Sequence, residues 1–112
     1  MITFEEIKRL MALASQKNYG IEILFCVNGS EVFDQCWMGR LYDEADGEVY
    51  WLGLTPDGKN GFDYPTFEEL SAARVFNGSS LFEIWDKVEF LEINACEPRL
   101  MLDMYLSEGE CK

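Results

Sequence analysis

Residues 62–93 constrain the fold most, because two helix-start signals and one strand signal follow one another within this segment. Thr66 is followed three residues later by Glu69, and Ser80 is followed in the same way by Glu83. This spacing is typical of a capping box, in which the hydroxyl and the carboxylate each accept a hydrogen bond from a backbone N–H group at the start of a helix. The pattern therefore predicts two short helices in the middle of the chain, one starting at Thr66 and one at Ser80.

The residues that follow Ser80 carry an apolar stripe with the 3.6-residue period of a helix. Its members are Leu81, Ile84, Trp85 and Val88. We expect Trp85 to anchor the core, because a large aromatic side chain on such a stripe is usually buried. Residues 88–94 are mainly β-branched, aromatic or leucine, which predicts a strand. Asn77 and Gly78 tolerate positive φ and predict a sharp turn between the two helices.

A helix and three antiparallel strands are predicted for the N-terminal half of the chain. Thr3 and Glu6 form another capping box, and the apolar stripe behind it predicts a helix over residues 4–16. The dipeptide Asn28-Gly29 is a strong signal for a two-residue hairpin turn between β-rich segments. The predicted strands form a meander over residues 21–27, 31–42 and 48–54.

The four cysteines are predicted to be free thiols. They are Cys26, Cys36, Cys96 and Cys111, and none lies in a C-x-x-C pair. The two-residue turn would place Cys36 opposite Ile21 and far from Cys26, whereas bridged cysteines need Cα atoms within about 7 Å. The chain also has no histidine to complete a mixed zinc site.

The C-terminal segment is ambiguous between helix and strand, because nearly every position of residues 100–106 is apolar. Its length and the turn residues at 96–98 favour a strand that pairs with residues 88–94, and residues 107–112 are expected to fray. The expected fold is a single α+β domain over residues 1–112. It has an antiparallel sheet of about four to five strands, made of the meander and the C-terminal strands, with an N-terminal helix and two short middle helices mainly on one face.

Charge and composition exclude several classes of protein. Twenty-one acidic residues against nine basic ones give a formal net charge of −12, which argues against direct binding of nucleic acid and of anionic membranes. Hydrophobic residues make up 48% of the chain, enough for a packed core. The N-terminus carries acids where a signal peptide needs bases, and no apolar run approaches the ~20 residues of a membrane span. We therefore expect a cytoplasmic protein.

The sequence argues against an enzyme, and it predicts no cofactor and no metal. Without histidine, the usual Ser-His-Asp and Cys-His arrangements cannot form, and the commonest general base near neutral pH is missing. No glycine motif that cradles nucleotide phosphates occurs. Gly39 and Gly53 stand alone within predicted strands and instead indicate bulges or close packing.

Candidate binding residues come from an acidic loop over residues 43–48 and from aromatic positions of the meander. The loop lacks the alternating acids and distal glutamate of a calcium-binding EF-hand, so we expect a solvated hairpin tip. If helices cover only one face of the meander, some rings lie on the open face, where an apolar patch with a negative rim suits a basic surface. The alternative is that the rings fill a second small core or a homodimer contact. The candidate residues are Asp43, Glu44, Asp46, Glu48, Tyr50, Trp37 and Trp51.

These features predict an acidic, non-enzymatic binding protein that acts as an inhibitor or regulator. Its partner would be a basic protein surface, including that of a nucleic-acid-binding protein. Immunity proteins and nucleic-acid mimics share this size and charge, which is an analogy of class alone. Two alternatives remain open. A small carboxylate- or metal-dependent enzyme would need a concave pocket with converging acids of strongly perturbed pKa. A homo-oligomeric structural domain would use the aromatic face to bind its own copies.

Overall fold

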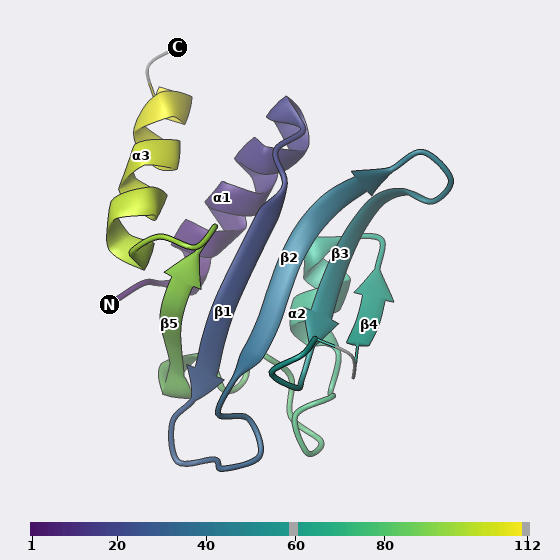
Figure 1. Ribbon diagram of the computed structural model, residues 1–112, viewed down its shortest axis with the longest axis vertical. Helices are drawn as coiled ribbons and strands as arrows, with labels where there is room; N and C mark the ends of the chain where they lie inside the picture. Colours follow the sequence, from purple (N-terminus) through teal and green to yellow (C-terminus); the bar gives the residue numbers. More distant parts are fainter. Residues whose placement is uncertain (59–60, 111–112) are drawn as a thin grey trace.

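The computed structural model describes residues 1–58 and 61–110, and they form an α+β fold around one open antiparallel sheet (Figure 1). The strand order is β4-β3-β2-β1-β5. The strands are β1 (Ile21–Val27), β2 (Cys36–Asp43), β3 (Gly47–Gly53), β4 (Gly61–Tyr64) and β5 (Val88–Ile93). The helices are α1 (Phe4–Lys17), α2 (Phe67–Ala72) and α3 (Pro98–Glu110), with a 3-10 turn over Trp85–Lys87. Within the described ranges, no helix is long and apolar enough to cross a membrane.

Helix α1 starts at the predicted capping box. The Thr3 hydroxyl accepts from the Glu6 backbone N–H at 3.1 Å, and the Glu6 carboxylate accepts from the Thr3 N–H at 2.9 Å. The helix ends at Asn18, whose φ of 57° is left-handed and breaks the helical path. Its apolar stripe packs on the sheet through buried residues that include Ile7, Leu10 and Met11. The predicted N-terminal helix is therefore confirmed.

The helices lie mainly on one side of the sheet, as Figure 1 shows for α1 and α2 behind the strands. Alternate residues of β1, which lies between β2 and β5, point into this layer, and Ile21, Ile23 and Phe25 are almost fully buried there. Helix α3 lies beside α1 and joins the same core through Leu102. The sheet thus has a covered face toward the helices and an open face on its other side.

The hairpin between β1 and β2 exists, but its predicted register is wrong. Phe25 pairs with Cys36, so residues 28–35 form a wide loop rather than a two-residue turn. The turn at Asn28-Gly29 does form, and the Val27 N–H then bonds the carbonyl of Phe33 at 2.8 Å. The buried side chain of Phe33 accounts for the wider loop, because it reaches back into the core.

The three cysteines within the described residues, Cys26, Cys36 and Cys96, are free. Cys36 faces the core opposite Phe25, whereas the neighbouring Cys26 points to the open face. The two cysteines therefore lie on neighbouring strands and closer together than predicted, but their thiols lie on opposite faces of the sheet. Cys111 lies outside the described residues.

The predicted C-terminal strand is wrong, because residues 100–106 belong to helix α3. Strand β5 pairs with β1 instead, and a tight turn through left-handed Asn94 follows it. Helix α3 then starts where the Glu97 carboxylate accepts from the Leu100 N–H at 2.7 Å, with Pro98 as the first helical residue. Proline at that position and an acid before it are a helix-start signal. Residues 107–112 were expected to fray, but residues 107–110 continue this helix. Residues 111–112 lie outside the described residues.

The second predicted middle helix is reduced to a single turn. Both bonds of its capping box form, from the Ser80 N–H to Glu83 at 2.9 Å and from the Glu83 N–H to Ser80 at 3.2 Å. Only a 3-10 turn follows, because pairing with β1 begins already at Val88. Trp85 packs against the core as expected, at 5.2 Å from the ring of Phe4, although it is only half-buried.

Two further details concern the middle of the chain. Helix α2 starts at Thr66 as predicted, with the Thr66 hydroxyl accepting from the Glu69 N–H. Strand β4 was not expected, and it extends the meander at the edge beside β3. Lys59 and Asn60 of the predicted turn before it lie outside the described residues.

Candidate functional site

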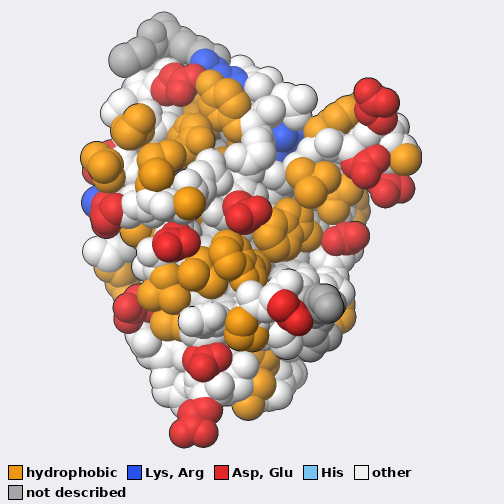
Figure 2. Space-filling view, viewed as in Figure 1, with side chains coloured by type: hydrophobic (Ala, Val, Ile, Leu, Met, Phe, Trp, Pro, Cys, Tyr) orange, Lys and Arg blue, Asp and Glu red, His pale blue; other side chains and the backbone are white. Residues whose placement is uncertain are grey.

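An apolar stripe crosses the open face of the sheet. Figure 2 shows it running diagonally, with acidic side chains on both sides. The strand register places its members next to one another on β1, β2 and β3, and we call them the open-face stripe: Leu24, Trp37, Leu41, Val49 and Trp51. Each of them is partly or well exposed. The stripe therefore leaves apolar surface accessible on the open face.

Each tryptophan of the stripe faces a glycine across strands β2 and β3. Trp51 is paired with Gly39, and Trp37 with Gly53. A Cβ atom at Gly39 would lie 2.7 Å from the Trp51 ring and 2.1 Å from the carbonyl oxygen of Ile21. The indole of Trp51 therefore lies across the bare backbone of β2, which confirms that Gly39 marks close packing.

Trp37 is held by the turn over residues 55–58. Its indole N–H donates to the carbonyl oxygen of Pro56 at 3.0 Å. The same turn folds over the other glycine, because a Cβ at Gly53 would come within 3.0 Å of the Cα of Gly58. Both indoles are thus fixed in position on the open face before any partner binds.

Acidic residues surround the stripe on the same face. Glu89 and Glu92 project from β5, Glu22 from β1 and Asp63 from β4. Within residues 1–58 and 61–110, none of these four carboxylates forms an ion pair. Their charges add to a negative potential over an apolar surface.

The seven residues predicted from the sequence lie in three different places. Trp37 and Trp51 belong to the open-face stripe. Asp43, Glu44 and Asp46 are exposed at the tip of the hairpin between β2 and β3. There the Asp43 carboxylate accepts from the backbone N–H of Ala45 at 2.7 Å and so shapes the turn. Glu48 and Tyr50 point to the covered face instead.

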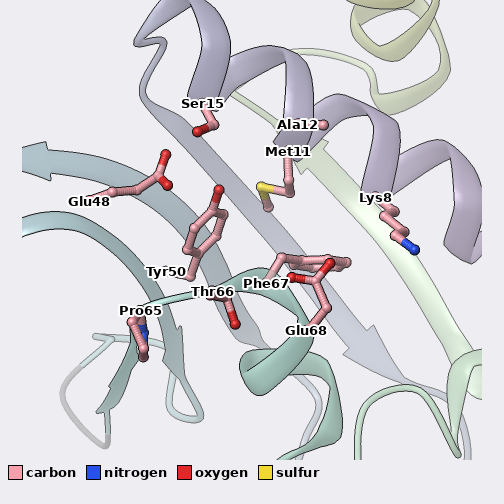
Figure 3. A pocket seen from close by; sticks show the side chains of 10 residues that line it. All are labelled: Lys8, Met11, Ala12, Ser15, Glu48, Tyr50, Pro65, Thr66, Phe67 and Glu68. Atoms are coloured by element: carbon pink, nitrogen blue, oxygen red, sulfur yellow. The ribbon is translucent and has the colours of Figure 1, made fainter.

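Glu48 and Tyr50 line a pocket of about 340 Å³ between α1, β3 and the start of α2. Figure 3 shows their polar groups pointing toward Ser15 of α1. Arg40, which is 3% exposed, binds the Glu48 carboxylate through two nitrogens at 2.7 and 2.8 Å. Burial favours a higher pKa for Glu48, but hydrogen bonds from Ser15 and Arg40 outweigh it, so that its pKa is lowered. Burial raises the pKa of Tyr50, as does the charge of Glu48. At neutral pH this cluster is an ionised ion pair beside a neutral phenol, which suits a structural role.

The other carboxyl groups with a clear pKa shift are also lowered by bonds that hold the structure. Hydrogen bonds from Arg99 lower the pKa of Glu6 to about 2, together with the bond from the Thr3 N–H. The backbone N–H of Ser80 lowers the pKa of Glu83. In the described part of the chain, no group of three or more cysteines or acids is placed to hold a metal ion. The lowered pKa values of these carboxyl groups therefore reflect bonds within the fold.

Comparison with protein-family models, with curated proteins and with solved structures gives no significant match for this chain. The open face is thus interpreted from its own residues. Sequence reasoning found its two tryptophans but missed the acids on β1 and β5 and the pairing of each indole with a glycine. The alternation of Glu22 with buried isoleucines in the sequence was a usable signal that Glu22 projects from the open face. The pairing of each indole with a glycine depends on the register of β2 and β3, which only the structure shows.

Proposed function

We propose that this chain is a non-enzymatic inhibitor or regulator in the cytoplasm, and that its open sheet face docks on a basic protein surface. The observation that carries the proposal is the open-face stripe with its two fixed tryptophans, flanked by carboxylates that have no basic partner among the described residues. Tryptophan is enriched among the few residues that carry most of the binding energy at interfaces, while surrounding charges steer encounter and select the partner.

The charge of the face favours a basic protein over the other candidate partners. A second copy of the chain would bring the acids around one stripe against those around the other, because a two-fold interface pairs the same patch with itself. Nucleic acid and anionic lipid would meet the same repulsion. A basic surface is what nucleic-acid-binding proteins present, and the carboxylates of the open face would compete there with phosphate groups.

A set of matched charge reversals tests this function. The first variant carries Glu22→Lys and Glu89→Lys on the open face, and the second carries Glu44→Lys and Asp46→Lys at the hairpin tip. The control carries Glu5→Lys and Glu68→Lys on the helical side. All six positions are exposed, and each pair changes the net charge by the same amount. Thermal unfolding first establishes that each variant folds.

The three variants and the wild-type chain are then used to capture proteins from lysate at rising salt concentration, with identification by mass spectrometry. We expect a basic partner whose capture weakens as salt rises. The open-face reversal should abolish its capture and the control should retain it. Equal capture by the open-face variant and the control would contradict docking through this face. If the hairpin-tip variant captures the partner as well as the wild-type chain does, the tip lies outside the interface.

A further inference from the structure

A hollow lies between the two indoles of the open face. It has a volume of about 340 Å³ and is lined by Glu22, Trp37, Trp51, Pro56, Asp57 and Gly58. Its lining combines two aromatic rings with two carboxylates, and none of the described residues that form it is basic. Resting on the function proposed above, we infer that this hollow receives one arginine side chain of the basic partner.

The two indoles form fixed walls of the hollow. Trp37 lies opposite Gly53, two residues along β3 from Trp51, so the tryptophans are diagonal neighbours with Cβ atoms within about 8 Å of each other. The Trp51 ring rests on Gly39, and the Trp37 N–H is bound by Pro56. Rigid walls of this kind reduce the entropy lost when a side chain binds between them.

Carboxylates on two sides of the hollow supply negative charge. The Glu22 side chain is exposed, and within the described residues its carboxylate has no hydrogen-bond or ion-pair partner. The carboxylate of Asp57 accepts from the Thr55 hydroxyl at 2.6 Å, which orients it at the other side of the hollow. A second hollow of about 450 Å³ shares Glu22 and Trp51 with the first.

A guanidinium group matches these walls better than other cations. It is planar and stacks on an indole face, and its fork of N–H donors can bind a carboxylate at the same time. An ammonium group is compact and strongly hydrated, so it gains less from an aromatic wall. A neutral side chain of the same length would bring no charge to balance the Glu22 carboxylate.

The test is an NMR titration of the ¹⁵N-labelled full chain with three short peptides that differ only in a central arginine, citrulline or lysine. The chain has three tryptophans, so its indole N–H signals report separately on the hollow and on a control site. Trp85 is the control, because it packs against α1 and donates to the carbonyl of Ile2 on the covered side. Single Trp→Phe variants assign the three signals.

We expect the arginine peptide to shift the Trp37 and Trp51 signals in a saturable way, with affinity of roughly millimolar order, and to leave Trp85 unmoved. Citrulline should produce no saturable shift, and lysine a weaker one. The variant Glu22→Gln should bind arginine about two- to fivefold more weakly, whereas Glu5→Gln should bind it unchanged.

Three results would overturn the inference. They are equal shifts with arginine and citrulline, equal affinity for lysine, and the absence of a saturable arginine shift at either indole. Failure of the hollow can be told from failure of the proposed function. Loss of the captured partner in the open-face reversal with no arginine binding would leave the docking face intact and refute the hollow. If the hollow binds arginine but capture of the partner is insensitive to that reversal, the hollow is supported and docking through the open face is refuted.

Discussion

The two faces of the sheet handle charge in opposite ways. On the covered face Arg40 is almost fully buried, yet it donates to Glu48, to the Asn18 side chain and to the carbonyl of Tyr19. On the open face, Glu22 and its acidic neighbours lie beside partly exposed indoles, and none of these carboxylates forms an ion pair within the described residues. On the covered face the charge of Arg40 is paired within the fold. On the open face the carboxylates are not paired within the described residues and remain accessible to solvent or to a partner.

This difference separates residues that hold the fold from residues that remain for binding. Buried charges must be paired, because an isolated one is strongly destabilising. Exposed like charges raise the free energy of the folded chain slightly through self-repulsion. Substitutions of charged residues can test this difference, because a change at Arg40 should destabilise the fold far more than a change at Glu22.

The largest effect is expected from Arg40→Met. It should lower the free energy of unfolding by about 3 kcal/mol, because it removes the partner of the half-buried Glu48 carboxylate. Urea unfolding measures the change. The matched control is Arg74→Met, since Arg74 also pairs with a glutamate but its side chain is 67% exposed. The control should lose no more than about 0.5 kcal/mol, and equal losses would mean that the Arg40 pair is not integral to the core.

Gly39→Ala should be the next most severe change, with a loss of about 2 kcal/mol. The added methyl would meet the Ile21 carbonyl oxygen at 2.1 Å and the Trp51 ring at 2.7 Å, so strand and indole must move apart. Gly20→Ala is the control, because a methyl group added there would have no other atom within 4 Å and the φ of Gly20 is not positive. Thermal unfolding of both variants, with tryptophan fluorescence as a readout of Trp51, checks the prediction. Similar melting temperatures would refute the packing of Trp51 on Gly39.

Glu6→Gln should destabilise the chain by about 1 kcal/mol at neutral pH, because Arg99 binds both carboxylate oxygens of Glu6, at 2.7 and 3.1 Å. The pKa of Glu6 is lowered from 4.5 to about 2, so its contribution is complete above pH 4.5 and is lost as the pH falls toward 2. Urea unfolding at several pH values should show wild type and variant converging toward about pH 2. Glu5→Gln, one residue away and exposed, should cost only about 0.3 kcal/mol. A difference between Glu6→Gln and wild type that persists at the acidic end would contradict the ion pair.

The smallest effect on stability is expected on the open face. Glu22→Gln combined with Glu92→Gln should leave the free energy of unfolding unchanged or raise it by up to about 0.5 kcal/mol, because it removes repulsion and breaks no ion pair. The same variant should capture the basic partner less well. Urea unfolding at low and high salt provides the measurement. A loss comparable to that of Arg40→Met would show that these acids also hold the fold.

The sequence predicted elements whose signals are local. Thr3 and Glu6 mark the start of α1, and Thr66 marks that of α2, because a capping box acts within one helical turn. The register of β1 and β2 was mispredicted because it depends on Phe33 packing into a core formed by distant segments. The Ser80 helix was overextended for a similar reason, since pairing of β5 with β1 ends it. These features are tertiary, and sequence periodicity does not encode them.

The candidate site was predictable in part for the same reason. Composition and the aromatic meander pointed to Trp37 and Trp51, which the structure places together on the open face. The same pattern also selected Glu48 and Tyr50, which the alternation of β3 directs to the covered face.

Helix α3 was missed although its sequence carries a start signal. The signal is the Glu97-Pro98 pair, and the apolar run that follows it is equally compatible with a strand.

The most direct test of docking through the open face is an NMR titration of the chain with the purified partner, following the indole N–H signals. Trp37 and Trp51 lie on the open face, and Trp85 lies on the covered side with its N–H bound to Ile2. We expect the first two signals to shift or broaden on binding while the Trp85 signal stays in place. A complex that perturbs Trp85 and leaves Trp37 and Trp51 unchanged would place the interface on the helical side and contradict the proposed function.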